Sequence, residues 1–461
     1  TAAGQGAVTD GNSNVASGLG ATALGSDNTA IGAGASAQGY NNAAIGQSAL
    51  SLGSSNMANG KAAIAQGDSS VASANGSVAV GQTASATAVN SIAVGTNTVA
   101  DGLNSVAVGG ASQALANNTV AIGSKATVAA GAGDGSFAGG TSTVLNGVGA
   151  VSIGHLNVSS GDGAVSIGDP NIATGTGAVT IGANNTAVGQ GAVAQGNLNV
   201  VTGQGAVALG DQNTATGKSA IVLGQGSSAN GDRAIAVGEA AVASRNSIAM
   251  GSGAVAGLEG SVALGADSVT SGASSISGNA AYIVKFNSGA VLEGSGNVVS
   301  VGSPGAERQI QNVAAGEVSS KSTDAVNGSQ LYSVADTVIK NGEASARNFG
   351  GGSTYTDGVL NAPSYIINGR MSHDVGSALN QLQDDGNAGV SAALAAAGLR
   401  YDSRPGKFST AASLGYYYNQ MGLALGAGLT TIDGKTRINA ALTITPSARK
   451  PVSGVSMGVS H

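Results

Sequence analysis

The stretch Ser77-Val78-Ala79-Val80-Gly81 decides the fold of this chain, because its pattern returns at a constant step. It begins again at Ser91, Ser105 and Thr119, 14 residues apart each time. Such a regular repeat is the signature of a repeat architecture. Followed outward, the unit begins 19 times, at Ala7, Ala21, Ala35, Ala49, Ala63, Ser77, Ser91, Ser105, Thr119, Ser136, Ala150, Ala164, Ala178, Ala192, Ala206, Ala220, Ala234, Ser247 and Ser261.

Within each unit the residue types alternate with the period of a β-strand. Val78 and Val80 lie on one face, while Ser77 and Ala79 lie on the other. A Gly also recurs every seven residues over long stretches, which disfavours a coiled coil because Gly weakens helices. Each unit is therefore predicted to form two short strands and two tight turns, one circuit of a parallel β-solenoid. We expect the Val face to fill the roll and the Ser/Ala face to meet a neighbouring copy.

The repeat has irregularities that carry their own predictions. Three extra residues near 131–135 predict a bulged loop, and one residue is lost before Ser247. At roughly 4.8 Å per circuit the rod is predicted to be about 90 Å long. Periodicity fades after Gly272, where 282–286 (Tyr-Ile-Val-Lys-Phe) predicts a separate strand. Residues 298–302 are a last, imperfect copy of the repeat.

Composition excludes several classes of protein. The 461 residues include 77 Gly, no Cys and no Trp, and only 9% are charged, against roughly 25% in ordinary soluble domains. A net charge of −6 disfavours a nucleic-acid partner, which a basic surface would have to attract. No apolar run is long enough for a transmembrane helix. No signal peptide precedes the first repeat, so we expect that an exported protein had its signal removed or left out.

The repeat resembles a known family. Residues 104–109 (Asn-Ser-Val-Ala-Val-Gly) and the related 90–95 are similar to the head repeat of the trimeric autotransporter adhesins, the Yersinia adhesin A-like family. The resemblance implies a left-handed parallel β-roll in which three chains form one head.

A second resemblance follows the repeats and is more specific, because it is not low in complexity. Two segments, 307–316 and 323–331, are similar to the neck of the same adhesins, which implies a step down from a wide head to a narrow coiled coil. Helical spacing over Ser329 to Lys340 agrees with this, and an ordinary linker with a short helix is the alternative. The neck motif comprises Arg308, Gln309, Ile310, Asn312, Val313, Ala314, Ala315, Gly316, Thr323, Asp324, Ala325, Val326, Asn327, Gln330 and Leu331.

A small β insert is predicted after the neck. Phe349, Gly350 and Gly351 interrupt the helical pattern, and 362–369 alternates like a strand that ends in a turn. The segment is similar to the FGG insert found in stalks of this family. We expect only a turn or two of helix on either side of it. Helix then resumes at Asp374 and becomes rich in small residues over 388–397, ending at Gly398.

The last 60 residues contain four segments that alternate between apolar and small residues, as outer-membrane β-strands do. Four strands cannot close a barrel, and an open edge is not viable in lipid, so three copies are predicted to supply twelve strands around three helices (374–397). A soluble β-sandwich is the alternative. His461 stands where family chains usually end in an aromatic residue. The predicted lipid-facing residues are Leu414, Tyr416, Leu423, Leu425, Leu442, Ile444, Val455, Met457 and Val459.

No catalytic or cofactor-binding pattern is present. His155, His373 and His461 are isolated, which disfavours a metal site, and His155 is expected to face solvent. The Gly-rich strings have no following helix, so a dinucleotide site is not predicted. We therefore expect no enzyme and no cofactor, and the repeats single out no ligand-binding residue.

The predicted architecture is mainly β, in five parts: a head (1–275), a transition (276–306), a neck with a short helix (307–348), the insert (349–375) and a membrane anchor (376–461). The resemblance implies a homotrimeric adhesin of the bacterial cell surface and outer membrane. It would attach to host matrix, cells or surfaces, depend on barrel-insertion machinery, and carry a translocator-type barrel. A structural surface fibre without a receptor is the alternative.

Overall fold

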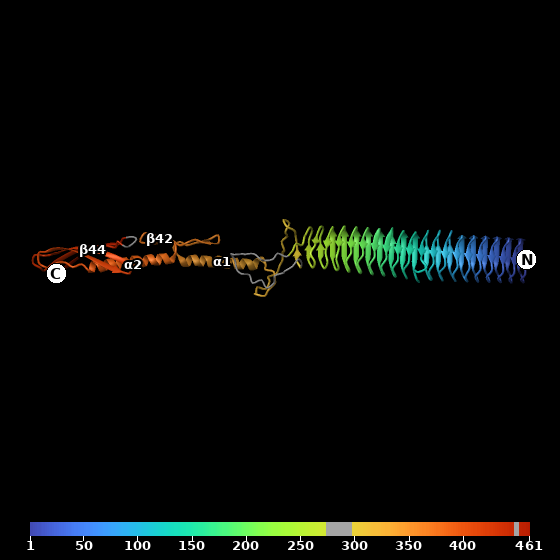
Figure 1. Cartoon of the computed structure of the whole chain (residues 1–461), viewed down its shortest axis with the longest axis horizontal. Coiled ribbons are helices and arrows are strands. Elements are labelled where there is room, and N and C mark those ends of the chain that lie inside the picture. The colour runs from blue at the N-terminus through green and yellow to red at the C-terminus, as the bar shows by residue number, and fades with distance from the viewer. Residues whose placement is uncertain (273–296, 447–450) are drawn as a thin grey trace. The chain divides into compact units, whose positions relative to one another are not determined.

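The computed structural model describes residues 1–272, 297–446 and 451–461. The chain divides into two compact units, Thr1–Ile310 and Gln311–His461. In the first unit the chain winds through a stack of rungs, most of which carry one longer and one shorter strand (Figure 1). The strand predicted at 282–286 lies outside the described residues.

The longer strands form one continuous parallel column, in which each pairs with the next along the chain. They are β1 (Val8–Asn12), β3 (Thr22–Ser26), β5 (Ser36–Tyr40), β7 (Leu50–Ser54), β9 (Ile64–Asp68), β11 (Val78–Gln82), β13 (Ile92–Val94), β15 (Val106–Val108), β17 (Val120–Ile122), β19 (Phe137–Thr141), β21 (Val151–His155), β23 (Val165–Gly168), β25 (Val179–Ala183), β27 (Val193–Asn197), β29 (Val207–Asp211), β31 (Ile221–Gln225), β33 (Ile235–Glu239), β35 (Ile248–Met250), β37 (Val262–Leu264) and β38 (Val299–Ser300).

The shorter strands form the second parallel column. They are β2 (Val15–Ala16), β4 (Thr29–Ala30), β6 (Ala43–Ala44), β8 (Met57–Ala58), β10 (Val71–Ala72), β12 (Ser85–Ala86), β14 (Val99–Ala100), β16 (Gln113–Ala114), β18 (Thr127–Val128), β20 (Val144–Leu145), β22 (Val158–Ser159), β24 (Asn171–Ala173), β26 (Asn185–Ala187), β28 (Val200–Val201), β30 (Thr214–Ala215), β32 (Ser228–Ala229), β34 (Val242–Ala243) and β36 (Val255–Ala256).

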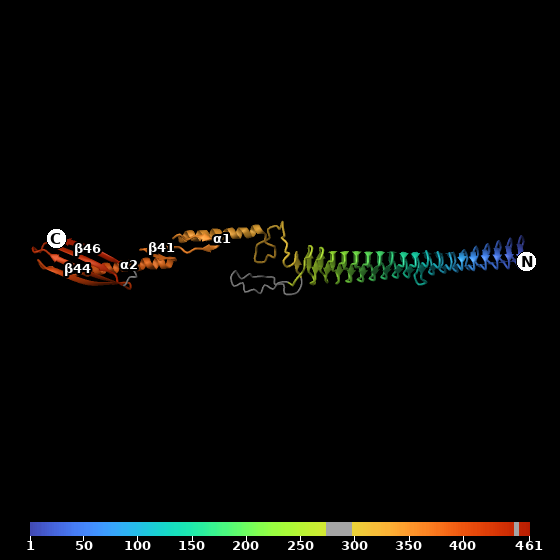
Figure 2. The same cartoon turned by 90° about the horizontal axis from the view of Figure 1, so that it is seen from above.

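The register confirms the predicted solenoid. Val78 pairs with Ile64 on one side and with Ile92 on the other, each one repeat away. Nineteen longer strands, β1 to β37, begin one residue after the predicted unit starts. Seen from above, the rungs repeat as a regular series (Figure 2).

The predicted assignment of the two faces is wrong. Ser77 and Ala79 are fully buried inside the roll, while Val78 and Val80 lie on the outside and are half-buried. The interior is lined mainly by Ala, including Ala65 and most of its counterparts up to Ala263. A rung of 14 residues brings its two strands close together, so most side chains between them are small, with Leu145 the largest that is fully buried.

Glycine is required where successive turns stack. A Cβ atom on Gly18 would lie 2.2 Å from the carbonyl oxygen of Gly32, which no real side chain tolerates. Gly25 is crowded in the same way and also has a φ of 114°, which L-residues rarely adopt. Close approach of backbones therefore explains the seven-residue Gly period.

A buried asparagine ladder runs along the turn between the longer and shorter strands, and the sequence reasoning missed it. The Asn28 side-chain amide donates to the backbone oxygens of Leu24 (2.8 Å) and Gly39 (2.7 Å). The Asn28 Oδ1 atom accepts from the backbone and side-chain nitrogens of Asn42, both at 3.0 Å. Because each amide satisfies carbonyls of two rungs, the ladder locks the turns in register. Its members are Asn14, Asn28, Asn42, Asn56, Asn157, Asn171, Asn185, Asn199 and Asn213.

Changes of rung length fall on only one of the two turns. Positions that are equivalent in the strand register stay seven residues apart from the longer to the shorter strand, as at Val165 and Ile172. The predicted insertion lies in the other turn, after β18, so that Thr127 pairs with Val144. The lost residue lies in that same turn, so that Val242 pairs with Val255. Both changes of length therefore fall in the turn opposite the one that carries the asparagine ladder.

The second unit contains the two helices and the remaining strands. Helix α1 (Gly328–Phe349) has 22 residues and α2 (Val375–Ala397) has 23, so the expectation of only a turn or two of helix beside the insert is wrong. Two hairpins separate the helices, and four antiparallel strands follow α2 in sequential order. The strands are β39 (Tyr355–Thr356), β40 (Val359–Leu360), β41 (Tyr365–Ile367), β42 (Arg370–Ser372), β43 (Phe408–Tyr417), β44 (Gln420–Thr430), β45 (Arg437–Ile444) and β46 (Ser453–Ser460).

Candidate functional site

The end of the head is closed by a segment from further along the chain. β38 pairs in parallel with β37, with Val262 opposite Val299, so residues 298–302 add a last rung as the imperfect repeat predicted. Arg308, a predicted neck residue, lies against this rung. Its guanidinium donates to Ser268 Oγ (3.0 Å) and to the backbone oxygen of Val301 (2.7 Å).

The neck residues of the second unit fold back onto the start of α1. Gln330 Nε2 donates to the backbone oxygen of Gly316 (2.7 Å), and Gln330 Oε1 accepts from the Gly316 N–H (3.1 Å). Asn327 is the N-cap of α1 and forms a capping box with Gln330. Asn327 Nδ2 also donates to Val313 O (3.1 Å), and the Glu317 N–H donates to Asp324 Oδ2 (3.0 Å). Five predicted neck residues therefore come together in one loop closure.

The other neck residues are not drawn into this closure in a single chain. The apolar side chains of Ile310, Val326 and Leu331 are 60–70% exposed. Exposed apolar residues continue along α1 at Val334 and Val338, with the spacing of one helix face. A face of this kind is typical of a helix that packs against partners. The remaining predicted neck residues are Gln309, Asn312, Ala314, Ala315, Thr323 and Ala325, and no hydrogen bond of their side chains supports a separate role.

The insert begins where α1 ends, at Phe349. Gly350 and Gly351 have φ values of 62° and 57°, which stop the helix. The Tyr365 hydroxyl donates to the Phe349 carbonyl, and the Ser364 N–H donates to Gly351 O (2.7 Å). The three predicted insert residues thus form the corner on which the second hairpin closes.

The second hairpin is joined to α2 by polar contacts that sequence reasoning did not identify. Arg370 Nη2 contacts Asp385 Oδ1 at 3.0 Å, and both side chains are largely buried. Gln381 Nε2 donates to the Ile367 carbonyl at 2.6 Å. Asp374 is the N-cap of α2, and hydrogen bonds from Ser377 lower the pKa of its carboxyl below the ordinary value.

The small face of the C-terminal sheet packs against α2, as predicted for an inward face. A Cβ atom on Gly415 would lie 2.3 Å from Ser391 O of the helix, and one on Gly422 would lie 2.4 Å from the same oxygen. Further along the sheet, Gly426 and Gly428 are covered by the Tyr401 ring. Figures 1 and 2 both show α2 lying against the sheet.

The opposite face carries the predicted lipid-facing residues. Met457 is 82% exposed and Val455 is 71% exposed, while Leu423 is half-buried. Among the strands that the structure describes, none pairs with the outer edge of β43 or of β46. A hollow of about 270 Å³ also remains beside α2, lined in part by Ala392, Ala396, Gly454 and Ser456. One chain therefore leaves both an apolar face and part of the inner face uncovered. The predicted residues on the outer face are Leu414, Tyr416, Leu423, Leu425, Leu442, Ile444, Val455, Met457 and Val459.

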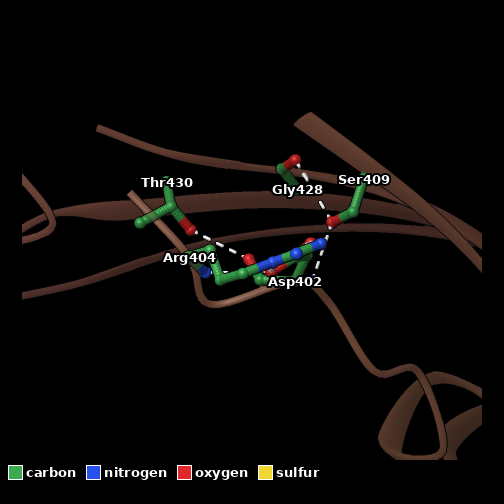
Figure 3. A network of polar contacts seen from close by, with 5 residues as sticks. All are labelled: Asp402, Arg404, Ser409, Gly428 and Thr430. Atoms are coloured by element: carbon green, nitrogen blue, oxygen red, sulfur yellow. Dashed lines mark hydrogen bonds and ion pairs between the residues drawn. The ribbon is translucent and has the colours of Figure 1, made fainter. Parts of the chain in front are cut away.

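The connection from α2 to β43 is held by a polar network, shown in Figure 3. Arg404 Nη2 contacts Asp402 Oδ2 at 2.7 Å, and hydrogen bonds from Arg404 lower the pKa of Asp402 to about 2. The Asp402 N–H donates to Ser409 Oγ (3.0 Å), and Thr430 Oγ1 donates to Asp402 O (3.0 Å). These contacts join the connection to the ends of β43 and β44.

The isolated histidines have modest roles. His155 is half-exposed, as expected, and its Nδ1 contacts Asp169 Oδ1 on the next rung at 2.8 Å. His461 Nδ1 lies 3.0 Å from Thr436 Oγ1. Within residues 1–272, 297–446 and 451–461, no three acidic, His or Cys side chains gather as a metal site would require. Among the helices that the structure describes, none has the length and apolar character needed to cross a membrane.

Two family models match the chain. The YadA head domain repeat matches 58–84, 72–98, 100–126, 146–169, 187–213, 202–227, 215–241, 229–254, 243–268 and 259–277. The coiled stalk of trimeric autotransporter adhesin matches 309–354, which contains most of the predicted neck.

Several curated proteins that the chain resembles are also named autotransporter adhesins. The autotransporter adhesin BtaE of Brucella suis biovar 1 (strain 1330) is 31% identical over 205 residues, which cover 31% of this chain and 27% of BtaE. EhaG of Escherichia coli O157:H7 is 35% identical over 107 residues, covering 23% of this chain and 6% of EhaG. AtaA of Acinetobacter sp. (strain Tol 5) is 38% identical over 105 residues, covering 22% of this chain and 3% of AtaA. The chain thus spans about a quarter or less of the length of these relatives.

Two solved structures are also similar in sequence. The C-terminal YadA-like domain of a Burkholderia pseudomallei protein is 32% identical over 32% of this chain and 63% of that chain, with a TM-score of 0.15. The collagen-binding domain of the Yersinia adhesin YadA is 23% identical over 54% of this chain and 84% of that chain, with a TM-score of 0.14. TM-scores this low establish no shared arrangement of the whole chain.

Proposed function

Because the chain belongs to the YadA-like trimeric autotransporter adhesins, we propose that it is a homotrimeric adhesin anchored in a bacterial outer membrane. The four C-terminal strands carry this proposal. They present an apolar face away from α2 and leave the edges of β43 and β46 unpaired. Open edges are not viable in lipid, so three copies would close twelve strands into one barrel.

Three equivalent copies also explain the uncovered inner surface of the anchor. The hollow beside Ala392 and Ser456 is lined by small residues, as a helix–helix contact requires. In a trimer, side chains of a neighbouring α2 helix would pack into this space. The same barrel would first serve as the translocator through which the head leaves the cell, with barrel-insertion machinery as a partner.

The head would supply the attachment surface. Its rungs repeat the same outer positions along the rod, so three copies offer many equivalent contacts whose weak affinities sum through avidity. The adhesin names of the relatives favour this role over that of a spacer without a receptor. Host matrix, cells or abiotic surfaces are the proposed partners.

The test compares the full chain with a variant that lacks residues 1–310, both displayed on Escherichia coli. An epitope tag before Gln311 reports surface level in each, so that loss of attachment is separated from loss of export. Binding is measured to immobilised collagen, fibronectin and laminin, to cultured epithelial cells and to polystyrene. We expect the full chain to bind at least one of these and the deletion to lose that binding. Equal binding by both at equal surface level would support a spacer.

The trimer is tested separately, by gel migration of the detergent-extracted chain with and without heating. We expect a band of three chains that heating converts to one. A monomer in mild detergent would contradict the closed barrel.

A further inference from the structure

The last rung of the head solves a problem that every solenoid has. A parallel edge exposes a row of unpaired N–H and C=O groups, which invites pairing with another chain. Repeat proteins therefore need a terminal cap. In the part of the chain that the structure describes, no strand pairs with β38 on its far side. The turn of this rung also lacks a ladder asparagine, since Gly305 lies four residues after Val301.

Arg308 makes the hydrogen bonds that this missing asparagine would make. In an inner rung, the Asn42 amide donates to Gln38 O, four residues earlier, and to Asn28 Oδ1 of the preceding rung. At the end of the head, Arg308 Nη1 donates to Val301 O and to Ser268 Oγ. Val301 corresponds to Gln38 in the repeat, and Ser268 occupies the ladder position of the preceding rung.

The same guanidinium also replaces a backbone contact. In inner rungs, the backbone N–H of the residue before the ladder asparagine donates to a backbone oxygen of the preceding rung. Asp27 N, for example, donates to Asn12 O (2.9 Å). At the last rung, Arg308 Nη2 donates instead to Ala266 O (2.5 Å), which is the equivalent of Asn12 O. The guanidinium lies on Gly265, where an added Cβ would be 3.2 Å from Arg308 Cζ.

Two hydrogen bonds, one of them to Glu307, fix the loop that precedes Arg308. The Gly305 N–H donates to Glu307 Oε1 at 2.9 Å, and the Ala306 N–H donates to Ser303 O at 2.8 Å. These two bonds tighten the turn that would otherwise carry an asparagine, and the long Arg308 side chain reaches Ser268 at the ladder position of the preceding rung.

We propose that Arg308 is the terminal cap of the column of turns that carries the asparagine ladder in earlier rungs, with one guanidinium replacing the side-chain and backbone donors of a further turn. The planar fork of Arg suits this role, because it presents several donors at fixed angles to several oxygens. Lys has the charge but not the fork. The head would therefore end at residue 308 rather than at 275, and its end would be closed by the first residue of the neck motif.

Hydrogen–deuterium exchange on the detergent-solubilised full chain tests the proposal with Arg308→Ala and Arg308→Lys. We expect Arg308→Ala to speed exchange of the amides at 262–269 and 299–306 by about tenfold or more, because it removes charge-assisted hydrogen bonds. Arg308→Lys should give an intermediate increase. Amides at 78–108, more than ten rungs away, should not change in either variant. The matched control is Arg233→Ala, which removes an exposed head arginine whose Nε donates to Asn246 Oδ1 (2.8 Å).

A second variant keeps the proposal testable if Arg308→Ala fails to fold. Ser268→Ala removes one acceptor of the guanidinium and leaves Arg308 in place, so we expect a smaller, about threefold, increase confined to the same amides. Unchanged exchange at 262–269 in both Arg308→Ala and Ser268→Ala would overturn the proposal. An increase spread evenly over all rungs would also overturn it, because a terminal cap acts locally.

Discussion

Head and anchor are both built from strands that alternate large and small residues, yet they use the two faces differently. In the head, the small face is enclosed by the same chain, and Ala79 is fully buried between the two strand columns. In the anchor, the small face is covered by a helix, and Gly415 and Gly422 lie against Ser391. The large residues face outward in both. The comparison shows that small residues mark the face that another backbone approaches.

The two regions differ in what their outward residues meet. The head's outer valines, such as Val78 and Val80, are half-buried even in one chain. The anchor's outer residues, such as Val455 and Met457, are far more exposed. We expect the outer face of the anchor to tolerate no charge, whereas the head should be most sensitive to changes on its inner face.

The largest expected effect is on the outer face of the anchor. Leu425→Arg places a charge at the middle of β44, and we expect it to destabilise the membrane-inserted barrel by about 2–4 kcal/mol per site, the cost of Arg near the bilayer midplane. Urea unfolding in lipid vesicles measures it. The control is Ile432→Arg in the neighbouring turn, outside the strands, which should be nearly neutral. Equal stability of Leu425→Arg and the wild type would argue for a soluble sheet.

The next effect is on the inner face of the head. Ala79→Leu forces a larger side chain between Ala65 and Ala93, which stack on it in register. Overpacking of this kind costs about 1–3 kcal/mol. We expect faster hydrogen exchange in the rungs around residue 79, whereas Val80→Leu on the outer face should leave exchange unchanged. The reverse ranking would restore the original assignment of the faces.

A comparable or smaller effect is expected within the ladder. Asn42→Ala leaves Gly53 O and the Asn56 N–H without their side-chain partners, at a cost of about 1–2 kcal/mol. Thermal unfolding of the head, followed by circular dichroism, should show a lower Tm. Asn41→Gly is the matched control, because residue 41 has a φ of 53° and its side chain is exposed. A Tm equal to the wild type in Asn42→Ala would show that water replaces the ladder without loss.

The smallest effect concerns pH at the connection before β43. The pKa of Asp402 is lowered from 3.8 to about 2, so its contribution to stability is present above pH 3.8 and is lost as the pH falls toward 2. As the pH falls over this range, the amides of residues 402–409 should therefore exchange slightly faster than the pH dependence of the intrinsic exchange rate alone would give. In Asp402→Asn this extra rise should be absent. A rise of the same size in Asp402→Asn would assign it to other carboxyl groups.

Much of this architecture is readable from local pattern, because each rung uses only neighbours one repeat away. The 14-residue step predicted the strands and the parallel register. The insertion at 131–135 and the loss of one residue before Ser247 were also located correctly. The ends of α1 at Phe349 and of α2 at Ala397 followed from the glycines that come next. The neck residues Asn327 and Gln330 were identified by resemblance to the family. The hydrogen bonds by which they close the loop were not predicted.

The sequence by itself determined the repeat, its strands, its glycine turns and the alternation in the anchor, because all of these depend on spacing along the chain. Only the tertiary structure decided which face lies inside. That choice depends on the distance between the two strand columns, which the repeat period does not specify. The same holds for the asparagine ladder, whose partners lie one rung away, and for Arg308, which reaches Ser268 across 40 residues. Contacts between turns depend on how closely backbones approach, and that distance is set by packing.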